Sequence, residues 1–166
     1  MQEYFHSVTL NRDKCTGCTN CIKRCPTEAI RVRDGKARII KERCIDCGEC
    51  IRVCPHHAKT AVTDPLEIKN AYRYSIAMPA PTLYGQFKNV TDISYILGAI
   101  KKLGFDDVFE TSVGADIVSG YTRRMIQKER RRRPLISSAC PAVVRLIQVR
   151  FPAFTDNIVN LRPPVE

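Results

Sequence analysis

The first third of the chain alternates between apolar and charged residues around one tight turn. The stretch AIRVRDGKARII, residues 29–40, shows this alternation on both sides of Asp34-Gly35. The alternation predicts two strands, and Asp-Gly between them is a strong signal for a two-residue hairpin turn. The stretches YFHSVTL and KTAVT predict an outer pair of strands around this hairpin.

The spacing of the apolar residues changes after residue 64. YSIAMPAP is a brief apolar run with two prolines near its end, which predicts a buried strand entering a tight loop. TDISYILGAIKKLGF has helical periodicity, and Gly104 is placed to end that helix. One face of the helix would carry Ile93, Ile96, Leu97, Ile100 and Leu103.

Strands and helices are predicted to alternate through the rest of the chain. DDVFETS and PLISS predict strands, whereas GADIVSGYTRRMIQKERRRR and PAVVRLIQVRF predict helices, the second of which opens with Pro141. Strands that alternate with helices favour parallel pairing. We therefore expect an α+β module over residues 1–63, a linker over 64–74 and an incomplete α/β domain with a parallel sheet over 75–166.

Eight of the nine cysteines lie in the first module. The stretches CTGCTNCIKRCP and CIDCGECIRVCP share one spacing, C-x-x-C-x-x-C-x-x-x-C-P. Two-residue gaps bring three thiolates to one face of a metal cluster, and the fourth cysteine comes a helical turn later and faces away. Pro26 and Pro55 then turn the chain. The two runs are Cys15, Cys18, Cys21, Cys25 and Cys44, Cys47, Cys50, Cys54.

This spacing resembles that of bacterial ferredoxins with two 4Fe-4S clusters, and the resemblance covers residues 5–63. In that family the fourth cysteine of each run binds the cluster of the other run. A module of this size is not expected to fold stably without its clusters. The resemblance implies one cluster on Cys15, Cys18, Cys21 and Cys54, and a second on Cys44, Cys47, Cys50 and Cys25.

Zinc is the alternative metal for C-x-x-C pairs. Tetrahedral zinc needs two such pairs per ion and leaves Cys25-Pro26 and Cys54-Pro55 unexplained, so we favour iron-sulfur clusters. His56 and His57 follow the second run directly. Because both quartets are already complete, we expect these histidines to be solvated or to form hydrogen bonds.

The chain is basic, with a formal net charge of +10. Two oxidised clusters, each with a charge of about −2, bring this to roughly +6, so we expect an acidic redox partner such as a ferredoxin. The run RRMIQKERRRRP raises nucleic-acid binding as an alternative. It also suits the solvated C-terminal end of a helix, and no recognised nucleic-acid motif accompanies it, so we expect no nucleic acid as a partner.

The cellular compartment is inferred from two features. No secretory signal and no apolar run of about 18 residues is found in the sequence, so we expect a cytoplasmic protein that does not contact the membrane. In such a reducing compartment, closely spaced cysteines favour metal binding over disulfides.

The ninth cysteine, Cys140, stands between a predicted strand end and a predicted helix. The helix dipole favours a thiolate there, as a metal ligand or a nucleophile, whereas a buried core thiol is the alternative. IAMPAPTLYGQF, AIKKLGFDDVFETSVGADIV and SSACPAVVRLI resemble, in this order, the catalytic domain of the FeFe-hydrogenase large subunit. The resemblance runs through residues 12–164. It implies that Cys140 is a ligand of the H-cluster and that Ala80, Pro81 and Thr82 line its diiron site.

The chain departs from that family in three ways. Ala139 replaces the cysteine that passes protons in the family, a feature that resembles hydrogen-sensing members, which often carry a downstream PAS signalling domain. The smaller change, Thr82, stands where serine is usual. The sequence also ends at LRPPVE, before the motifs for the other three H-cluster cysteines. We therefore expect an H-cluster only in a full-length parent.

These features together predict iron-sulfur electron transfer that feeds an FeFe-hydrogenase-like domain. In a full-length parent that domain would interconvert protons and hydrogen reversibly, under anaerobic conditions. Two alternatives stay open: a regulatory protein that senses hydrogen with low turnover, and a stand-alone electron carrier. No catalytic site is complete within these 166 residues.

Overall fold

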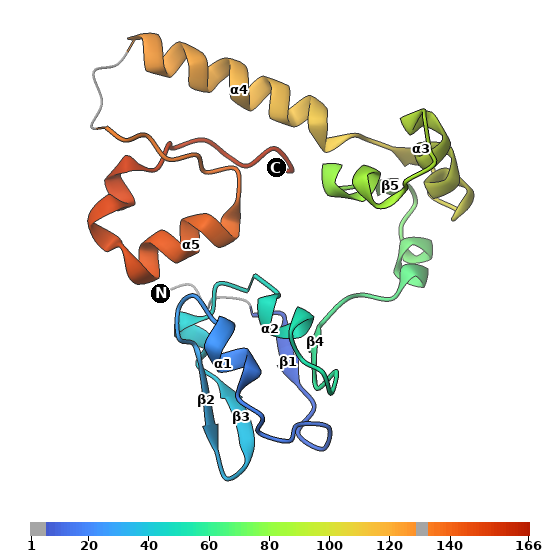
Figure 1. Cartoon of the computed structure of the whole chain (residues 1–166). Helices are drawn as coiled ribbons and strands as arrows, with labels where there is room; N and C mark the ends of the chain where they lie inside the picture. Colours follow the sequence, from blue (N-terminus) through green and yellow to red (C-terminus); the bar gives the residue numbers. More distant parts are fainter. Residues whose placement is uncertain (1–5, 129–132) are drawn as a thin grey trace. The chain divides into compact units, whose positions relative to one another are not determined.

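The computed structural model describes residues 6–128 and 133–166 (Figure 1). The chain divides into two compact units: the first combines Met1–Thr63 with Cys140–Ile158, and the second combines Asp64–Ala139 with Val159–Glu166. Among the described residues, no helix is both long and apolar enough to cross a bilayer.

The first unit contains the two predicted strand pairs. Strands β2 (Ile30–Arg33) and β3 (Lys36–Ile39) form an antiparallel hairpin, and β1 (Val8–Leu10) pairs antiparallel with β4 (Lys59–Ala61). Asp34 and Gly35 have φ of 51° and 68°, so both central residues of the hairpin turn are left-handed, as a type I′ turn requires. The predicted hairpin and outer strand pair are confirmed.

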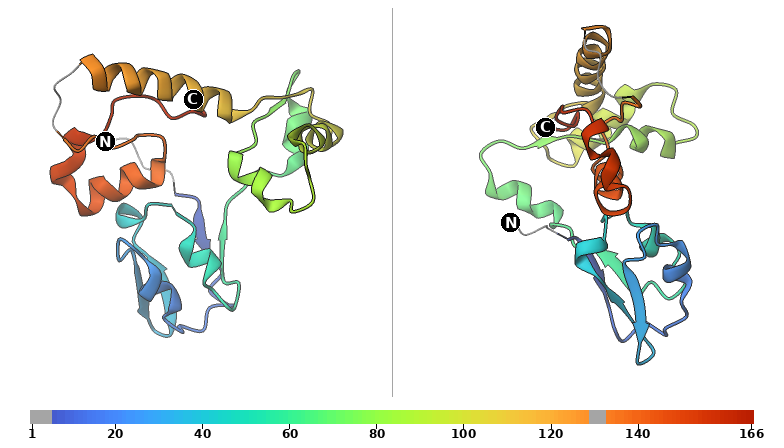
Figure 2. Two further views of the ribbon diagram at one scale, coloured as in Figure 1. Left: turned by 45° about the horizontal axis from the view of Figure 1, so that its top comes forward. Right: turned by 90° about the vertical axis from the view of Figure 1, so that its left-hand side faces the viewer.

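Two short helices follow the first cysteines of each run. They are α1 (Asn20–Arg24) and α2 (Glu49–Arg52), and α1 lies beside α2 and beside the hairpin (Figure 2). Each cysteine run, together with the residues that follow it, has three left-handed residues at matching positions, so the two halves share one backbone path. The matching pairs are Gly17 with Asp46, Thr19 with Gly48, and Glu28 with His57.

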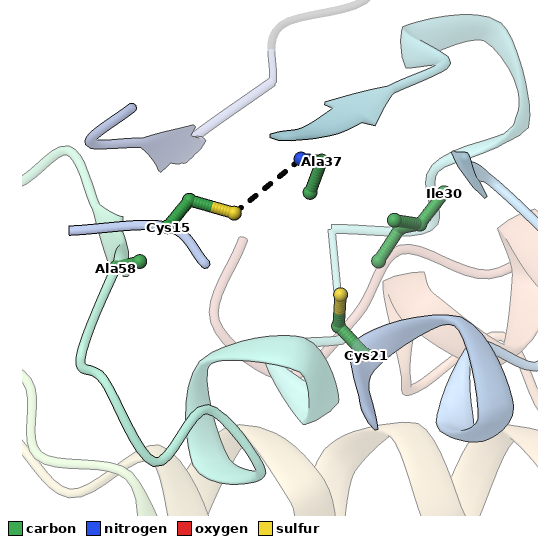
Figure 3. Packing of buried hydrophobic residues seen from close by; sticks show 5 residues of the cluster. All are labelled: Cys15, Cys21, Ile30, Ala37 and Ala58. Carbon is green, nitrogen blue, oxygen red and sulfur yellow. Dashed lines mark hydrogen bonds between the residues drawn. The ribbon is translucent and has the colours of Figure 1, made fainter. Parts of the chain in front are cut away.

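Cysteines form part of the core of this unit. Figure 3 shows Cys15 and Cys21 packed with Ile30, Ala37 and Ala58, and the Cys15 Sγ directed at the backbone N–H of Ala37. Only small and medium-sized side chains fill this space. Because the apolar core is so small, the metal centres must contribute to its stability.

A distant segment of the chain packs into the same unit. It comprises α5 (Pro141–Arg150) and the 3-10 helix η4 (Pro152–Asn157). The Arg145 guanidinium donates a hydrogen bond to the carbonyl oxygen of Glu42 at 2.9 Å, and Arg150 forms an ion pair with Glu28 at 3.1 Å. These contacts join residues more than 100 positions apart in the sequence.

The second unit has a small parallel sheet. Strand β5 (Ile76–Ala77) pairs in parallel with β6 (Asp107–Val108), and α3 (Ile93–Lys102) connects them. The Asp92 side chain caps α3 by accepting a hydrogen bond from the Ser94 N–H at 2.8 Å, and Gly104 follows the helix with φ of 91°. The remaining elements are η1 (Lys41–Arg43) of the first unit, and η2 (Leu66–Ala71), η3 (Pro81–Gln86) and α4 (Thr111–Lys128) of the second.

The predicted apolar face of α3 is only partly covered. Ile96 is buried, whereas Ile93 and Leu103 are 44% and 55% exposed. The predicted parallel sheet is confirmed only as a two-stranded pair, because PLISS does not form the third strand. Ile136 makes a single bridge instead, and its carbonyl oxygen accepts a hydrogen bond from Val159 at 2.8 Å. Of the basic run, Arg130, Arg131 and Arg132 lie outside the described residues.

The left-handed positions give a direct test of how tightly the first unit is packed. A Cβ added at Gly17 would lie 2.6 Å from the carbonyl oxygen of Gly35, whereas a Cβ at Gly48 would meet no atom within 4 Å. Both positions have φ of 71°, so both alanine variants carry the same backbone strain, about 1–2 kcal/mol. We expect Gly17→Ala to lose about 1–3 kcal/mol more than Gly48→Ala, because only the first creates a clash.

The measurement is anaerobic urea unfolding of the cluster-loaded variants, followed by absorbance. Equal midpoints for the two variants would contradict the close approach of the first cysteine loop to the hairpin turn.

Candidate metal centres

The nine cysteines all lie in the described residues, and none forms a disulfide. Four of them surround one cavity in the first unit, which we call the first cavity. Its wall also contains apolar residues of β1, β2 and β3, together with His56 and Lys59. The four cysteines are Cys15, Cys18, Cys21 and Cys54.

A second cavity of the first unit is also lined by four cysteines and apolar side chains. Its wall includes apolar side chains such as Val8, Ile30 and Ile45. The two cavities are equal in volume, each about 20 Å³. In each cavity three cysteines come from one run and the fourth from the other. The four cysteines of the second cavity are Cys44, Cys47, Cys50 and Cys25.

Backbone N–H groups donate to the sulfur atoms in both cavities. Such hydrogen bonds favour the charged thiolate, and they tune the potential of an iron-sulfur cluster. The four that donate are Ala37 to Cys15 at 3.3 Å, Asp46 to Cys44 at 3.3 Å, Ala29 to Cys25 at 3.2 Å and Ala58 to Cys54 at 3.3 Å. The last two match each other in the repeat, since each donor follows its cysteine by four residues.

Burial opposes ionisation at several of these thiols. It raises the pKa of Cys50 to about 11 and also raises the pKa values of Cys21 and Cys44. Burial likewise acts to raise the pKa of Cys15, but hydrogen bonds from Ala37 and Gly17 and nearby lysines outweigh it and lower that pKa. A buried thiolate needs a compensating charge, and a metal centre supplies one. The donor set and its surroundings therefore fit iron-sulfur clusters.

Asp46 connects the second cysteine run to the outer strands. Its carboxylate accepts hydrogen bonds from the backbone N–H groups of Ser7 and Val8 at 3.1–3.2 Å. Ligand atoms of Asp46, His6 and Cys44 also lie within 4.8 Å of one another. Because Cys44 faces the second cavity and Asp46 holds β1, we assign this group to the structure around that cavity. Sequence reasoning missed Asp46, although its match with Gly17 in the repeat marks a special backbone position.

The two histidines after the second run are both exposed. His56 lies in the wall of the first cavity, and His57 has a left-handed φ of 46°. Each cavity has four cysteines without them.

The residues implied for the H-cluster fall in different units. Ala80 precedes η3, Pro81 and Thr82 begin it, and the Thr111 hydroxyl fixes the loop by donating to the Pro79 carbonyl oxygen at 2.9 Å. All three of these residues are exposed and belong to the second unit.

Cys140 is exposed and belongs to the first unit, where it is the N-cap residue of α5. Its carbonyl oxygen accepts hydrogen bonds from Val143 and Val144, but its thiol does not cap the helix. The helix therefore begins as the sequence predicts, although no strand precedes it. Because Cys140 is exposed, the alternative that it is a buried core thiol is wrong.

Comparison with known proteins agrees with this geometry. Residues 7–55 match the 4Fe-4S dicluster domain and residues 41–72 match the 4Fe-4S binding domain. Residues 73–166 match the C-terminal domain of the iron-only hydrogenase large subunit. The chain is thus an iron-sulfur protein that carries two 4Fe-4S clusters. It belongs to the iron-only hydrogenase large subunit family, with an electron-transfer module and a hydrogenase-like domain.

Three relatives illustrate the extent of the similarity. The periplasmic [Fe] hydrogenase large subunit of Nitratidesulfovibrio vulgaris is 29% identical over 96% of this chain and 42% of its own length. Iron hydrogenase 1 of Clostridium pasteurianum is 25% identical over 99% of this chain and 33% of its own length. Ferredoxin-3 of Desulfocurvibacter africanus is 44% identical over 32 residues, 19% of this chain and 52% of its own length. The chain spans less than half the length of either hydrogenase.

The Asp46 contacts give a test of this site. We expect Asp46→Ala to lose about 2–3 kcal/mol of stability, because hydrogen bonds to a charged acceptor are among the stronger ones. Asp46→Asn should lose less, since asparagine keeps an acceptor oxygen and tolerates the left-handed backbone at this position. Anaerobic iron release to a chelator should be fastest from Asp46→Ala, and Cys44 should become reactive to alkylation before Cys15. Release at the wild-type rate would show that Asp46 does not hold the second cavity.

Proposed function

We propose that each cavity holds one 4Fe-4S cluster through its four cysteines, and that the chain transfers single electrons between an external partner and its hydrogenase-like domain. The ligands of the first cluster are Cys15, Cys18, Cys21 and Cys54, and those of the second are Cys44, Cys47, Cys50 and Cys25. The observation that carries the proposal is the lining of each cavity by three cysteines of one run and one of the other. Bound clusters supply reversible one-electron chemistry at these positions.

The contacts of α5 support an order along the electron path. Arg145 contacts Glu42, two residues before Cys44, and Arg150 contacts Glu28, three residues after Cys25. Both cysteines line the second cavity. The second cluster would therefore connect the module to α5, the helix that begins after Cys140.

We further propose that Cys140 is a ligand of an H-cluster in the complete protein, where Ala80, Pro81 and Thr82 would line the diiron site. The support is the match of residues 73–166 to the hydrogenase family, together with an exposed thiol at the start of a helix. The reaction would be the reversible interconversion of protons and electrons with hydrogen. Domain limits of 1–63 and 75–166, with a linker over 64–74, are part of the same proposal.

A hydrogen sensor with low turnover is the second candidate function. Ala139 favours it, because an alanine side chain cannot transfer a proton. In both functions the module accepts and donates electrons in the same way.

Positive charge on the hairpin suits an acidic redox partner. Residues of β2, β3 and the turn into η1 line a shallow groove that is rich in guanidinium and ammonium groups. Complementary charge accelerates association between redox proteins. The basic residues of the groove are Arg31, Arg33, Arg38 and Lys41.

Substitution of the fourth cysteine of each run tests the proposed function. In Cys25→Ser the cluster of the second run should become labile, because serine replaces one of its thiolates. Iodoacetamide should then label Cys44, Cys47 and Cys50, as read by mass spectrometry of the peptides. Cys54→Ser is the matched control, in which the same treatment should label Cys15, Cys18 and Cys21. Labelling of Cys15, Cys18 and Cys21 in the Cys25→Ser variant would mean that each run binds its own cluster.

The wild-type chain gives a separate test of Cys140. Because its thiol is exposed and the other eight bind metal, we expect iodoacetamide to label Cys140 first in the anaerobic, cluster-loaded chain. Cys140→Ser should abolish this label and leave the iron content unchanged. If Cys140 is protected as strongly as the cluster ligands, or if Cys140→Ser removes iron, the thiol already binds metal in this chain.

A further inference from the structure

The repeat within the first unit contains one charged exception. CPTEAI, residues 25–30, and CPHHAK, residues 54–59, follow the same backbone path, so that Ile30 and Lys59 occupy matching positions. Both residues are only 2% exposed. Ile30 lines the second cavity and Lys59 lines the first. The wall of the first cavity thus has an ammonium group at the position where the wall of the second cavity has an apolar side chain.

Lys59 is held there by the sheet. It is the first residue of β4 and stands opposite Leu10 of β1. Its Nζ is buried and has no hydrogen-bond partner among the described residues. A buried charge without a partner is strongly unfavourable, and the groups that can compensate it on this side are the thiolates and the cluster that they would hold. Lys59 is therefore placed to interact with the metal centre.

The effect of Lys59 on the thiols agrees with this placement. Its charge acts to lower the pKa values of Cys15 and Cys21 in the first cavity. It acts in the same direction on Cys50, one of the four thiols of the second cavity. The charge of Lys59 thus acts on thiols of both cavities, whereas its side chain lines only the first.

We propose that Lys59 makes the two clusters unequal, so that the cluster in the first cavity accepts an electron before the cluster in the second. A 4Fe-4S cluster with four thiolates changes its net charge from about −2 to −3 when it gains one electron. The nearby ammonium stabilises the more negative state and raises the potential. The electron comes from a one-electron donor. No bond is formed or broken, and no proton is transferred.

This inference rests on the proposed ligand sets. The α5 contacts flank the second cavity, so the first cluster would lie at the other end of the path. There Lys59 makes it the site where an electron resides between transfers. Lys59 does not bind iron; it acts through its charge on the cluster that accepts the electron.

The test is an anaerobic redox titration of the reconstituted 166-residue chain, with each reduced cluster quantified by electron paramagnetic resonance. In Lys59→Met the ratio of reduced to oxidised first cluster should fall at least tenfold at a fixed ambient potential, which corresponds to 59 mV for a one-electron couple. The second cluster should change less. The control Lys14→Met removes an exposed charge next to Cys15 and should change either ratio less than twofold, because water screens it. Ile30→Lys, the reciprocal variant, should favour reduction of the second cluster.

An equal or larger change at the second cluster, or no change while both clusters remain intact, would overturn the inference. If Lys59→Met fails to retain its clusters, the wild-type chain still decides the question. In partly reduced wild-type protein, the Cβ-proton signals of Cys18 and Cys54 should show the paramagnetic shift of the reduced state before those of Cys25 and Cys47. The reverse order would contradict the role of Lys59. An error in the proposed ligand sets would be detected separately, by the alkylation pattern of the Cys25→Ser and Cys54→Ser variants.

Discussion

The structure of the first unit depends on the burial of thiolate sulfur around two metal centres. Its apolar core is small and contains Cys15 and Cys21, so two of the proposed ligands are also packing residues. Burial raises the pKa of Cys50 to about 11, which shows how unfavourable a thiolate is there without a cation. Metal binding through the proposed ligand sets would reverse that penalty and join the two cysteine runs, since each cavity is lined by cysteines of both. Folding and cluster assembly are therefore one process in this unit.

The repeated backbone and the different side chains around it have separate consequences. Left-handed residues at matching positions, such as Thr19 and Gly48, give both cysteine runs the same loop. Side chains then distinguish the two cavities: Asp46 ties the second run to β1, and Lys59 places a positive charge at the first. The exceptions to the repeat therefore make the surroundings of the two cavities different, although the backbone that forms them follows the same path.

Local chemistry explains which features could be predicted from the sequence. The resemblance carried by the cysteine spacing predicts the two sets of four cysteines that line the cavities, and Asp34-Gly35 determines the hairpin because few other dipeptides adopt two left-handed residues. The predicted helices form because their periodicity and caps are also local, as at Asp92. PLISS failed as a strand because its pattern cannot specify a neighbour to pair with; only Ile136 makes a bridge. The packing of α5 in the first unit involves a hydrogen bond and an ion pair between residues more than 100 positions apart, which no local pattern predicts. The buried position of Lys59 could have been found only by aligning the two repeats.

The most direct test of the account is the metal content of the wild-type chain after anaerobic reconstitution. Two complete quartets predict about eight iron and eight acid-labile sulfide per chain. After reduction, electron paramagnetic resonance should show two S = 1/2 clusters coupled to each other, because the crossed ligation that we propose would hold the clusters close together. Stoichiometric zinc without labile sulfide, or only four iron per chain, would contradict the account.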